Sequence, residues 1–216
     1  MRISEQTTVE GARADQRKLV IGVVGGIGAG KSTVARMLGE RGGLVIDADR
    51  LGHEALELPA VRERLIQLWG PGILKADGHP DRRAIAKIVF GDPAERTKLE
   101  ALVFGEIEAG IRRDIASAQS NPDVRFVVLD AAIMLETGWA KVCDHIVFVD
   151  APLEVRLARV AERSGWTADQ VASREAAQMD LATKRQQADV VILNTGSPDR
   201  LSRELDQLLQ QWSATS

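Results

Sequence analysis

Five short runs of apolar residues, rich in valine and isoleucine, alternate along the chain with stretches in which apolar residues recur every three or four positions. The runs cover residues 19–24, 44–46, 125–130, 145–150 and 189–193. Nearly continuous apolar runs of this length are typical of strands that are covered on both faces of a parallel sheet. Because strands and helices alternate, the pattern predicts an α/β fold with a five-stranded parallel sheet flanked by helices.

The intervals between these runs have helical periodicity and divide the chain into parts. Short helices are expected at residues 32–41, from about residue 153, and at 167–179 and 199–212, and a long one at 93–118. We expect a core made of residues 18–49, 124–152 and 188–213. A helical insertion, residues 50–123, and a second helical segment, residues 153–187, interrupt this core. Residues 1–17 are polar and are expected to form a flexible arm.

Between the first run and the first helix, residues 25–32 match the phosphate-binding pattern G-x-x-x-x-G-K-[ST]. Glycines in such a loop allow several backbone N–H groups to approach a polyphosphate, and the following helix directs its positive end at the same anion. The lysine neutralises the β- and γ-phosphates, and the serine hydroxyl binds Mg²⁺. The predicted nucleotide ligands are Gly26, Ile27, Gly28, Ala29, Gly30, Lys31, Ser32 and, as a weaker candidate, Thr33.

Acidic residues follow two of the predicted strands. Asp47 and Asp49 come directly after the second strand, and Asp130 ends the third. The carboxyl ends of parallel strands face the crevice in which such sheets bind ligands, so these acids are expected near the phosphate loop. Asp130 is a candidate for Mg²⁺ or its water shell, the alternative being a turn residue or cap. Asp49 has a second interpretation as the cap of the next helix.

The helix that begins near residue 153 carries Arg156, Arg159 and Arg163 on one face. Arginines on a helix after the fourth strand can clamp phosphates when a lid closes. The nearby Glu154 and Glu162 support a second interpretation, an ordinary solvated face with salt bridges.

Composition narrows the classes of function. The 216 residues are 44% hydrophobic and 27% charged with a net charge of −3, so no overall basic field favours nucleic acid or an anionic membrane as a partner. No segment reaches the length of a membrane span, the single cysteine fits a reducing cytoplasm, and the three histidines lack the spacing of a metal site. Residues 49–52 fit the D-x-x-G of GTPase switches, but the partner motif N-K-x-D is missing.

Several segments of the chain together resemble the dephospho-CoA kinase family. They are the phosphate loop, residues 45–49 (V-I-D-A-D), Asp130 with Glu136, residues 176–179 (A-A-Q-M) and residues 188–196 (A-D-V-V-I-L-N-T-G). The resemblance covers about residues 18–210. It implies a P-loop kinase fold with a helical acceptor-binding insertion and a helical lid. It also implies ATP- and Mg²⁺-dependent phosphorylation of the ribose 3′-hydroxyl of dephospho-CoA.

The resemblance assigns roles to single residues. Asp49 becomes the general base or hydroxyl-orienting group, while Lys31, Arg159 and Arg163 act on the transferred phosphoryl group. Ser32 and Asp130 are the expected metal ligands. Asn194 and Gly196 are expected near the adenine of ATP. The expected acceptor-binding residues are Asp49, Asp130, Arg82 and His53; His53 is a candidate because it lies four residues beyond Asp49 on the same helical face.

Two other functions remain open on the sequence alone. One is a P-loop kinase of another small acceptor, such as a nucleoside or nucleotide, and the other is a nucleotide-binding switch without turnover. Two segments, Ala131-Ala132 and Phe104-Gly105, depart from the usual family pattern. We expect a cytoplasmic monomer or weak oligomer.

Overall fold

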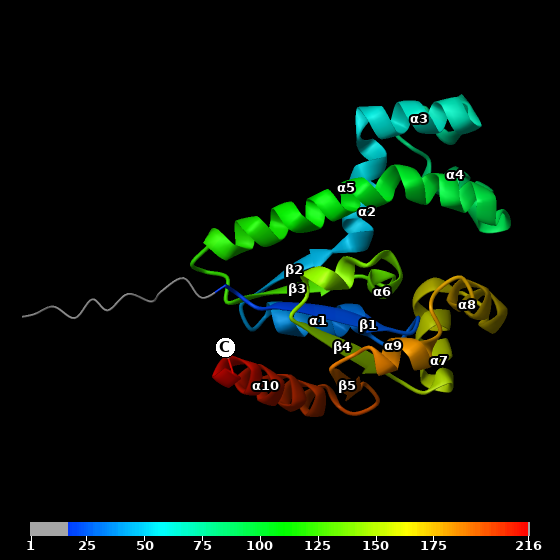
Figure 1. Ribbon diagram of the computed structural model, residues 1–216. Coiled ribbons are helices and arrows are strands. Elements are labelled where there is room, and N and C mark those ends of the chain that lie inside the picture. The colour runs from blue at the N-terminus through cyan, green and yellow to red at the C-terminus, as the bar shows by residue number, and fades with distance from the viewer. Residues whose placement is uncertain (1–16, 216) are drawn as a thin grey trace, which may run out of the picture.

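The computed structural model describes residues 17–215 and has a five-stranded parallel sheet at its centre (Figure 1). The strands are β1 (Val20–Gly25), β2 (Gly43–Asp47), β3 (Phe126–Asp130), β4 (His145–Asp150) and β5 (Val190–Leu193). Their order across the sheet is β2-β3-β1-β4-β5. All five predicted strands are confirmed, and β1, which carries the phosphate loop at its end, lies in the middle of the sheet.

Helices cover both faces of this sheet. The helices of the core are α1 (Lys31–Gly39), α6 (Met134–Thr137), η2 (Trp139–Val142) and α10 (Pro198–Thr215). The insertion contains α2 (Ala48–Glu57), α3 (Pro59–Trp69), η1 (Pro71–Ile73), α4 (Arg82–Gly91) and α5 (Pro93–Ser120). The segment predicted as a lid contains α7 (Leu153–Ser164), α8 (Ala168–Glu175) and α9 (Leu181–Gln186). In Figure 1 the insertion lies above the sheet and α10 below it.

The insertion shares its apolar core with one face of the sheet. A single cluster of buried side chains runs from Val20 and Leu129 in the strands to Leu65, Ile73 and Ile85 in the insertion. The helices α2 and α5 pack closely: a Cβ atom added to Gly110 on α5 would lie 2.9 Å from the Leu51 side chain on α2. The opposite face of the sheet packs against α1 and α10 through a separate cluster that includes Leu38 and Leu205.

Helix boundaries in the predicted lid differ from those expected. The helix predicted at 167–179 begins as expected, with Thr167 capping α8 in a capping box with Gln170, but it ends at Glu175. A further helix, α9, follows because the Asp180 side chain accepts a hydrogen bond from the Thr183 N–H and caps a new helix. The prediction of one helix was therefore wrong beyond residue 175.

Two other expectations concern the ends of the chain and membranes. The predicted flexible arm, residues 1–17, lies outside the described residues except for Arg17, whose exposed side chain pairs with Asp144. Within residues 17–215, no helix combines the length and the apolar character that crossing a bilayer requires.

Candidate active site

The phosphate loop joins β1 to α1, and its backbone conformation requires glycine. Gly25 and Gly30 have φ angles of 148° and 98°, in the region that side chains rarely adopt. Space is also limiting, because a Cβ atom at Gly25 would lie 2.3 Å from the Val149 carbonyl oxygen on β4. A Cβ atom at Gly30 would lie 2.1 Å from Nδ2 of Asn194. The loop is thus held by β4 and by the segment after β5.

Lys31 lies against this loop. Its Nζ donates hydrogen bonds to the carbonyl oxygens of Gly25 and Gly26, both at 3.1 Å. Burial lowers the pKa of Lys31, and the nearby Lys184 adds to this effect, while Asp130, Asp49 and Glu175 act in the opposite direction. Three carboxylates from different parts of the chain therefore lie near the loop lysine, and an incoming polyphosphate would meet its charge in a partly desolvated setting.

The predicted acids converge as expected at one edge of the sheet. Asp47 and Asp130 are register partners on β2 and β3. Burial raises the pKa of Asp130, whereas its hydrogen bond with the Ser32 side chain and the charge of Lys31 oppose the rise. With Ser32 and Asp47, Asp130 lines a cavity of about 500 Å³. The role of Asp130 in binding Mg²⁺ stays a prediction.

Asp47 lies at the N-cap of α2, whereas Asp49 lies within the first turn of this helix. The Asp47 side chain accepts a hydrogen bond from the Arg50 N–H at 3.0 Å and caps α2. Asp49 lies in the first turn of α2 with an exposed side chain, close enough to Asp130 to contribute to the rise of its pKa. The interpretation of Asp49 as the helix cap was therefore wrong, because Asp47 fills that position.

The donor set fits a magnesium ion held mainly by substrate. Within residues 17–215, no group of three or more His, Cys, Asp and Glu side chains is arranged to hold a metal ion. Mg²⁺ in phosphoryl-transfer sites uses one or two protein oxygens, phosphate oxygens and water. The hydrogen-bonded pair of Ser32 and Asp130 offers one hydroxyl and one carboxylate next to the phosphate loop, which matches this requirement.

Two of the three predicted arginines point at the phosphate loop. The Arg156 side chain is only 8% exposed, donates from Nη1 to the Ile27 carbonyl at 3.1 Å, and pairs with Glu175. Arg159 donates to the carbonyl oxygens of Ala29 and Asn194, at 3.3 and 2.9 Å. These contacts exclude the solvated salt-bridged face for Arg156 and Arg159, whereas Arg163 is exposed.

Asn194 also contacts the loop. Its Nδ2 donates to the Ala29 carbonyl at 2.8 Å, and its side chain is largely buried. Asn194 therefore braces the phosphate loop from the end of β5. Gly196 follows it, where an added Cβ atom would lie 3.1 Å from the Arg200 side chain.

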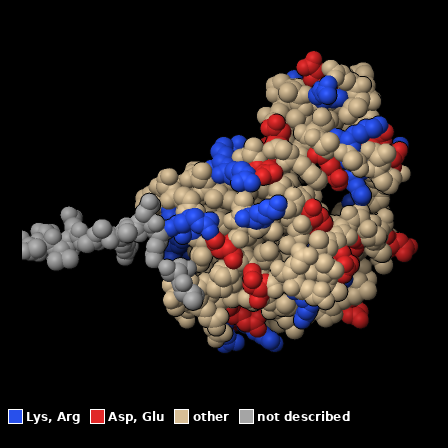
Figure 2. Space-filling model, viewed as in Figure 1, with Lys and Arg blue, Asp and Glu red and all other residues tan. Residues whose placement is uncertain are grey.

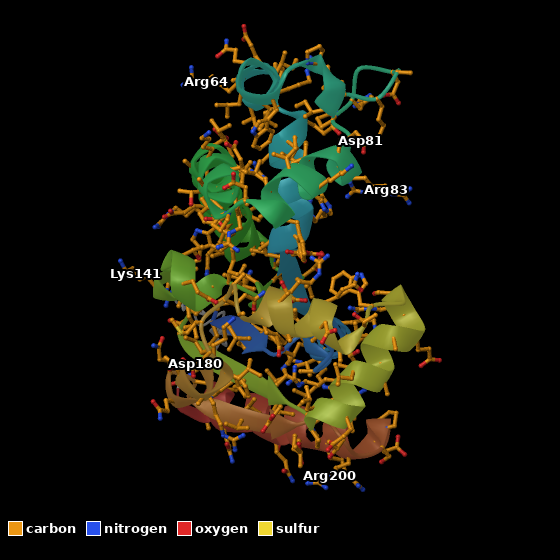
Figure 3. All side chains as sticks on the ribbon, turned by 90° about the vertical axis from the view of Figure 1, so that its right-hand side faces the viewer. Arg64, Asp81, Arg83, Lys141, Asp180 and Arg200 are labelled. Carbon is orange, nitrogen blue, oxygen red and sulfur yellow. The ribbon has the colours of Figure 1, made fainter. Side chains whose placement is uncertain are left out.

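The remaining predicted residues lie on the insertion. His53 on α2 and Arg82 at the start of α4 are both exposed. In Figure 3, Asp81 and Arg83, which flank Arg82, lie on the upper part of the molecule, away from Asp180 and Arg200 below. Figure 2 shows a notch between the insertion and the body beneath it, bordered by acidic and basic side chains. Acceptor contacts by His53 and Arg82 stay predictions.

Sequence reasoning missed a fully buried lysine, Lys184 on α9. Its Nζ donates to the Ala132 carbonyl at 2.6 Å and to Oε1 of Gln178 at 3.1 Å, and it pairs with Glu136 at 2.8 Å. Lys184 thereby connects the segment after Asp130 with the predicted lid. The neighbouring residues 183 and 185–187 are all polar and gave no sign of burial, so only the tertiary contacts identify Lys184.

The site combines a phosphate loop at the end of a central parallel strand with the loop lysine, a half-buried acid at the neighbouring strand end and arginines from a helical segment. This combination defines a P-loop phosphotransferase. A family model for dephospho-CoA kinase matches residues 19–199. The dephospho-CoA kinase of Symbiobacterium thermophilum is 40% identical over 191 residues, covering 87% of this chain and 78% of that protein. That of Bacillus licheniformis is 38% identical over 199 residues, covering 90% and 97%.

Solved structures agree with this result. A Thermus thermophilus protein has a TM-score of 0.77 at 37% identity and covers 91% of this chain and 98% of its own. The dephospho-CoA kinase of Campylobacter jejuni shares the fold, with a TM-score of 0.61 at 23% identity and coverage of 91% and 98%. The chain belongs to the dephospho-CoA kinase family, whose members are ATP-dependent phosphotransferases.

Proposed function

We propose that this chain transfers the γ-phosphoryl group of ATP to the ribose 3′-hydroxyl of dephospho-CoA, the last step of coenzyme A synthesis. Family membership supports the reaction, and the convergence of Lys31, Ser32 and Asp130 on one side of the sheet is the observation that carries it. A kinase has little covalent chemistry to perform: it aligns the acceptor hydroxyl with the γ-phosphoryl group and neutralises charge.

In the proposed mechanism each residue of the site has one role in phosphoryl transfer. The loop amides and Lys31 hold the phosphates, with Arg156 and Arg159 close to the loop backbone. Ser32 and Asp130 would hold Mg²⁺, which would supply positive charge to the phosphate oxygens. Asp49 accepts the proton of the 3′-hydroxyl. The hydroxyl oxygen meanwhile bonds to the γ-phosphorus, and the bond between this phosphorus and the leaving oxygen of ADP breaks. The insertion, with His53 and Arg82, binds the acceptor.

The direct test measures ADP release by the purified protein with ATP and Mg²⁺, with and without dephospho-CoA, and checks the product for a new 3′-phosphate. We expect turnover that depends on dephospho-CoA and that nucleosides, nucleotides and shikimate do not support. Turnover with one of those acceptors instead would assign the chain to another small-molecule kinase. ATP binding without turnover on any acceptor would favour the nucleotide-binding switch.

Two variants test the residue roles. Lys31→Ala is expected to lose almost all transfer, because the charge on the γ-phosphoryl group loses its nearest protein partner. Asp49→Asn is expected to keep ATP affinity and lose transfer, because its carboxylate acts on the acceptor. Asp123→Asn, an exposed acid before the start of β3, is the matched control and should leave both unchanged. Equal loss of ATP affinity in Asp49→Asn would mark Asp49 as a nucleotide or metal residue.

A further inference from the structure

A carboxylate of the protein itself lies on the phosphate loop. Oε1 of Glu175, at the end of α8, accepts a hydrogen bond from the Ile27 N–H at 2.8 Å. The same oxygen lies 2.5 Å from Nη1 of Arg156. Ile27 is the third residue of the loop, and the N–H groups of such loops are the donors that bind phosphate oxygens. The Glu175 carboxylate thus accepts a hydrogen bond from a loop N–H group of the kind that binds phosphate oxygens.

The surroundings show that this contact is close-fitting. A Cβ atom added to Gly26 would lie 2.8 Å from Nη1 of Arg156 and 3.0 Å from Oε1 of Glu175. The loop glycine is therefore needed for the carboxylate and the guanidinium to reach the backbone. The side chains of Arg156 and Glu175 are only 8% and 20% exposed. The negative charge of Glu175 also acts on Lys31, the loop lysine.

The charge balance explains why a carboxylate is present there. A buried guanidinium without a partner is strongly unfavourable, and so is a loop N–H without an acceptor. Glu175 satisfies both groups at once. A polyphosphate needs the same groups: the N–H of Ile27 and the positive charges of Arg156 and Lys31. A carboxylate and a phosphate oxygen cannot both occupy the Ile27 N–H at full strength.

We propose that Glu175 is an affinity-determining residue of the nucleotide site, which competes with the phosphates of ATP for the Ile27 N–H and the Arg156 guanidinium. Nucleotide binding then requires Glu175 to leave the loop. Because Glu175 ends α8, its departure removes the hydrogen bond that ties this helix end to the phosphate loop, which couples nucleotide entry to the predicted lid. The residue lowers ATP affinity and thereby limits the binding of ATP in an open site, where water can compete with the acceptor.

The test compares nucleotide affinity in four proteins: wild type, Glu175→Gln, Glu175→Ala and Asp169→Asn. Asp169 lies on the same helix, α8, and is exposed, so its variant removes an equal charge without touching the loop. Isothermal titration with ATP, without acceptor, is expected to give a Kd about fivefold or more below the wild-type value in Glu175→Gln. Asp169→Asn is expected to match the wild type. Glu175→Ala, which also removes the acceptor oxygen, should bind at least as tightly as Glu175→Gln.

A second measurement does not depend on a ligand. Hydrogen exchange of the Ile27 amide, followed by NMR in nucleotide-free protein, should be faster in Glu175→Ala than in wild type, since the amide loses its acceptor. Weaker ATP binding in both Glu175 variants would overturn the proposal, because Glu175 would then only position Arg156. Unchanged affinity, or equal changes in Asp169→Asn, would overturn it as well.

The inference rests on ATP as the nucleotide of this site, but not on the acceptor. Affinity is measured without dephospho-CoA, so an error in the acceptor assignment leaves the result unaffected. Wild-type protein that shows no ATP binding at all would overturn both the proposed function and the competition. Thermal unfolding of each variant, at a midpoint close to that of the wild type, establishes that the variants are folded when compared.

Discussion

Replacing Lys184 with methionine should be among the most destabilising single changes in this protein. Methionine has nearly the length of lysine and can fill the same buried space, but it has no charge and no donor. The change leaves the Ala132 carbonyl, Gln178 and the Glu136 carboxylate without the hydrogen bonds that Lys184 makes at 2.6, 3.1 and 2.8 Å. Lys184 is completely buried, so water cannot replace it.

The size of the loss follows from these contacts. Removing one partner of a buried ion pair costs about 3–5 kcal/mol, because the other charge is left uncompensated. Glu136 is 22% exposed and keeps a hydrogen bond from the Met179 N–H at 2.9 Å, which favours the lower end. We therefore expect Lys184→Met to lower the free energy of unfolding by about 3 kcal/mol. For a chain of this size, that is a fall in Tm of about 6–12 °C.

Urea unfolding at 25 °C gives the free energy, and calorimetry gives Tm. Lys141→Met, an exposed lysine on η2, is the matched control and should change the stability by less than about 0.5 kcal/mol. In a Glu136→Gln background, Lys184→Met should cost at least about 1 kcal/mol less, since no charge is stranded. A loss below about 1 kcal/mol in the single variant, or the same loss in both backgrounds, would refute the reasoning.

Three further predictions concern the phosphate loop, Asp130 and Cys143. Gly30→Ala should lower ATP affinity at least about tenfold in a titration, because the φ of 98° and the Asn194 side chain leave no room for a Cβ atom at Gly30. The control Gly72→Ala, at a glycine with open space around it, should leave ATP affinity unchanged. Asp130→Asn should raise Tm of the nucleotide-free protein near pH 7. Burial raises the pKa of Asp130, so the native state holds its proton more tightly than the unfolded state and loses stability as pH rises; the gain in Tm should shrink towards acidic pH. Burial also raises the pKa of Cys143 to about 12, so alkylation by iodoacetamide at about pH 8, followed by mass spectrometry, should be about 1,000-fold slower in native than in urea-unfolded protein; equal rates would contradict this.

The sheet could be predicted because its strands are buried on both faces. A strand such as β3 must be apolar at nearly every position, and this leaves a continuous pattern in the sequence. The phosphate loop was equally clear, since close backbone approach restricts Gly25 and Gly30 to one residue type. The acids Asp47 and Asp130 could be placed together because parallel strands end at a common edge.

The polar contacts of the predicted lid could not be derived in this way. Glu175 and Arg156 are separated by a loop and lie on different helices. The spacing of Arg156 suggested a phosphate contact, but nothing in the sequence indicated its pairing with Glu175. Lys184 is buried only because donors and acceptors from three segments meet there, a condition that no local periodicity records. The short α9 was missed as well: it has only six residues, and its start depends on the cap that Asp180 provides.

The length of α5 restricts how many residues can be inserted into this helix without changing its buried face. This helix has 28 residues and is therefore about 42 Å long, and it connects the end of α4 with the start of the turn into β3. Each residue added to a helix rotates everything beyond it by about 100°. An insertion of one or two residues in α5 would turn the residues beyond it, such as Ile107 and Ile111, out of the buried cluster that they share with α2, whereas an insertion of about seven residues would restore the same face.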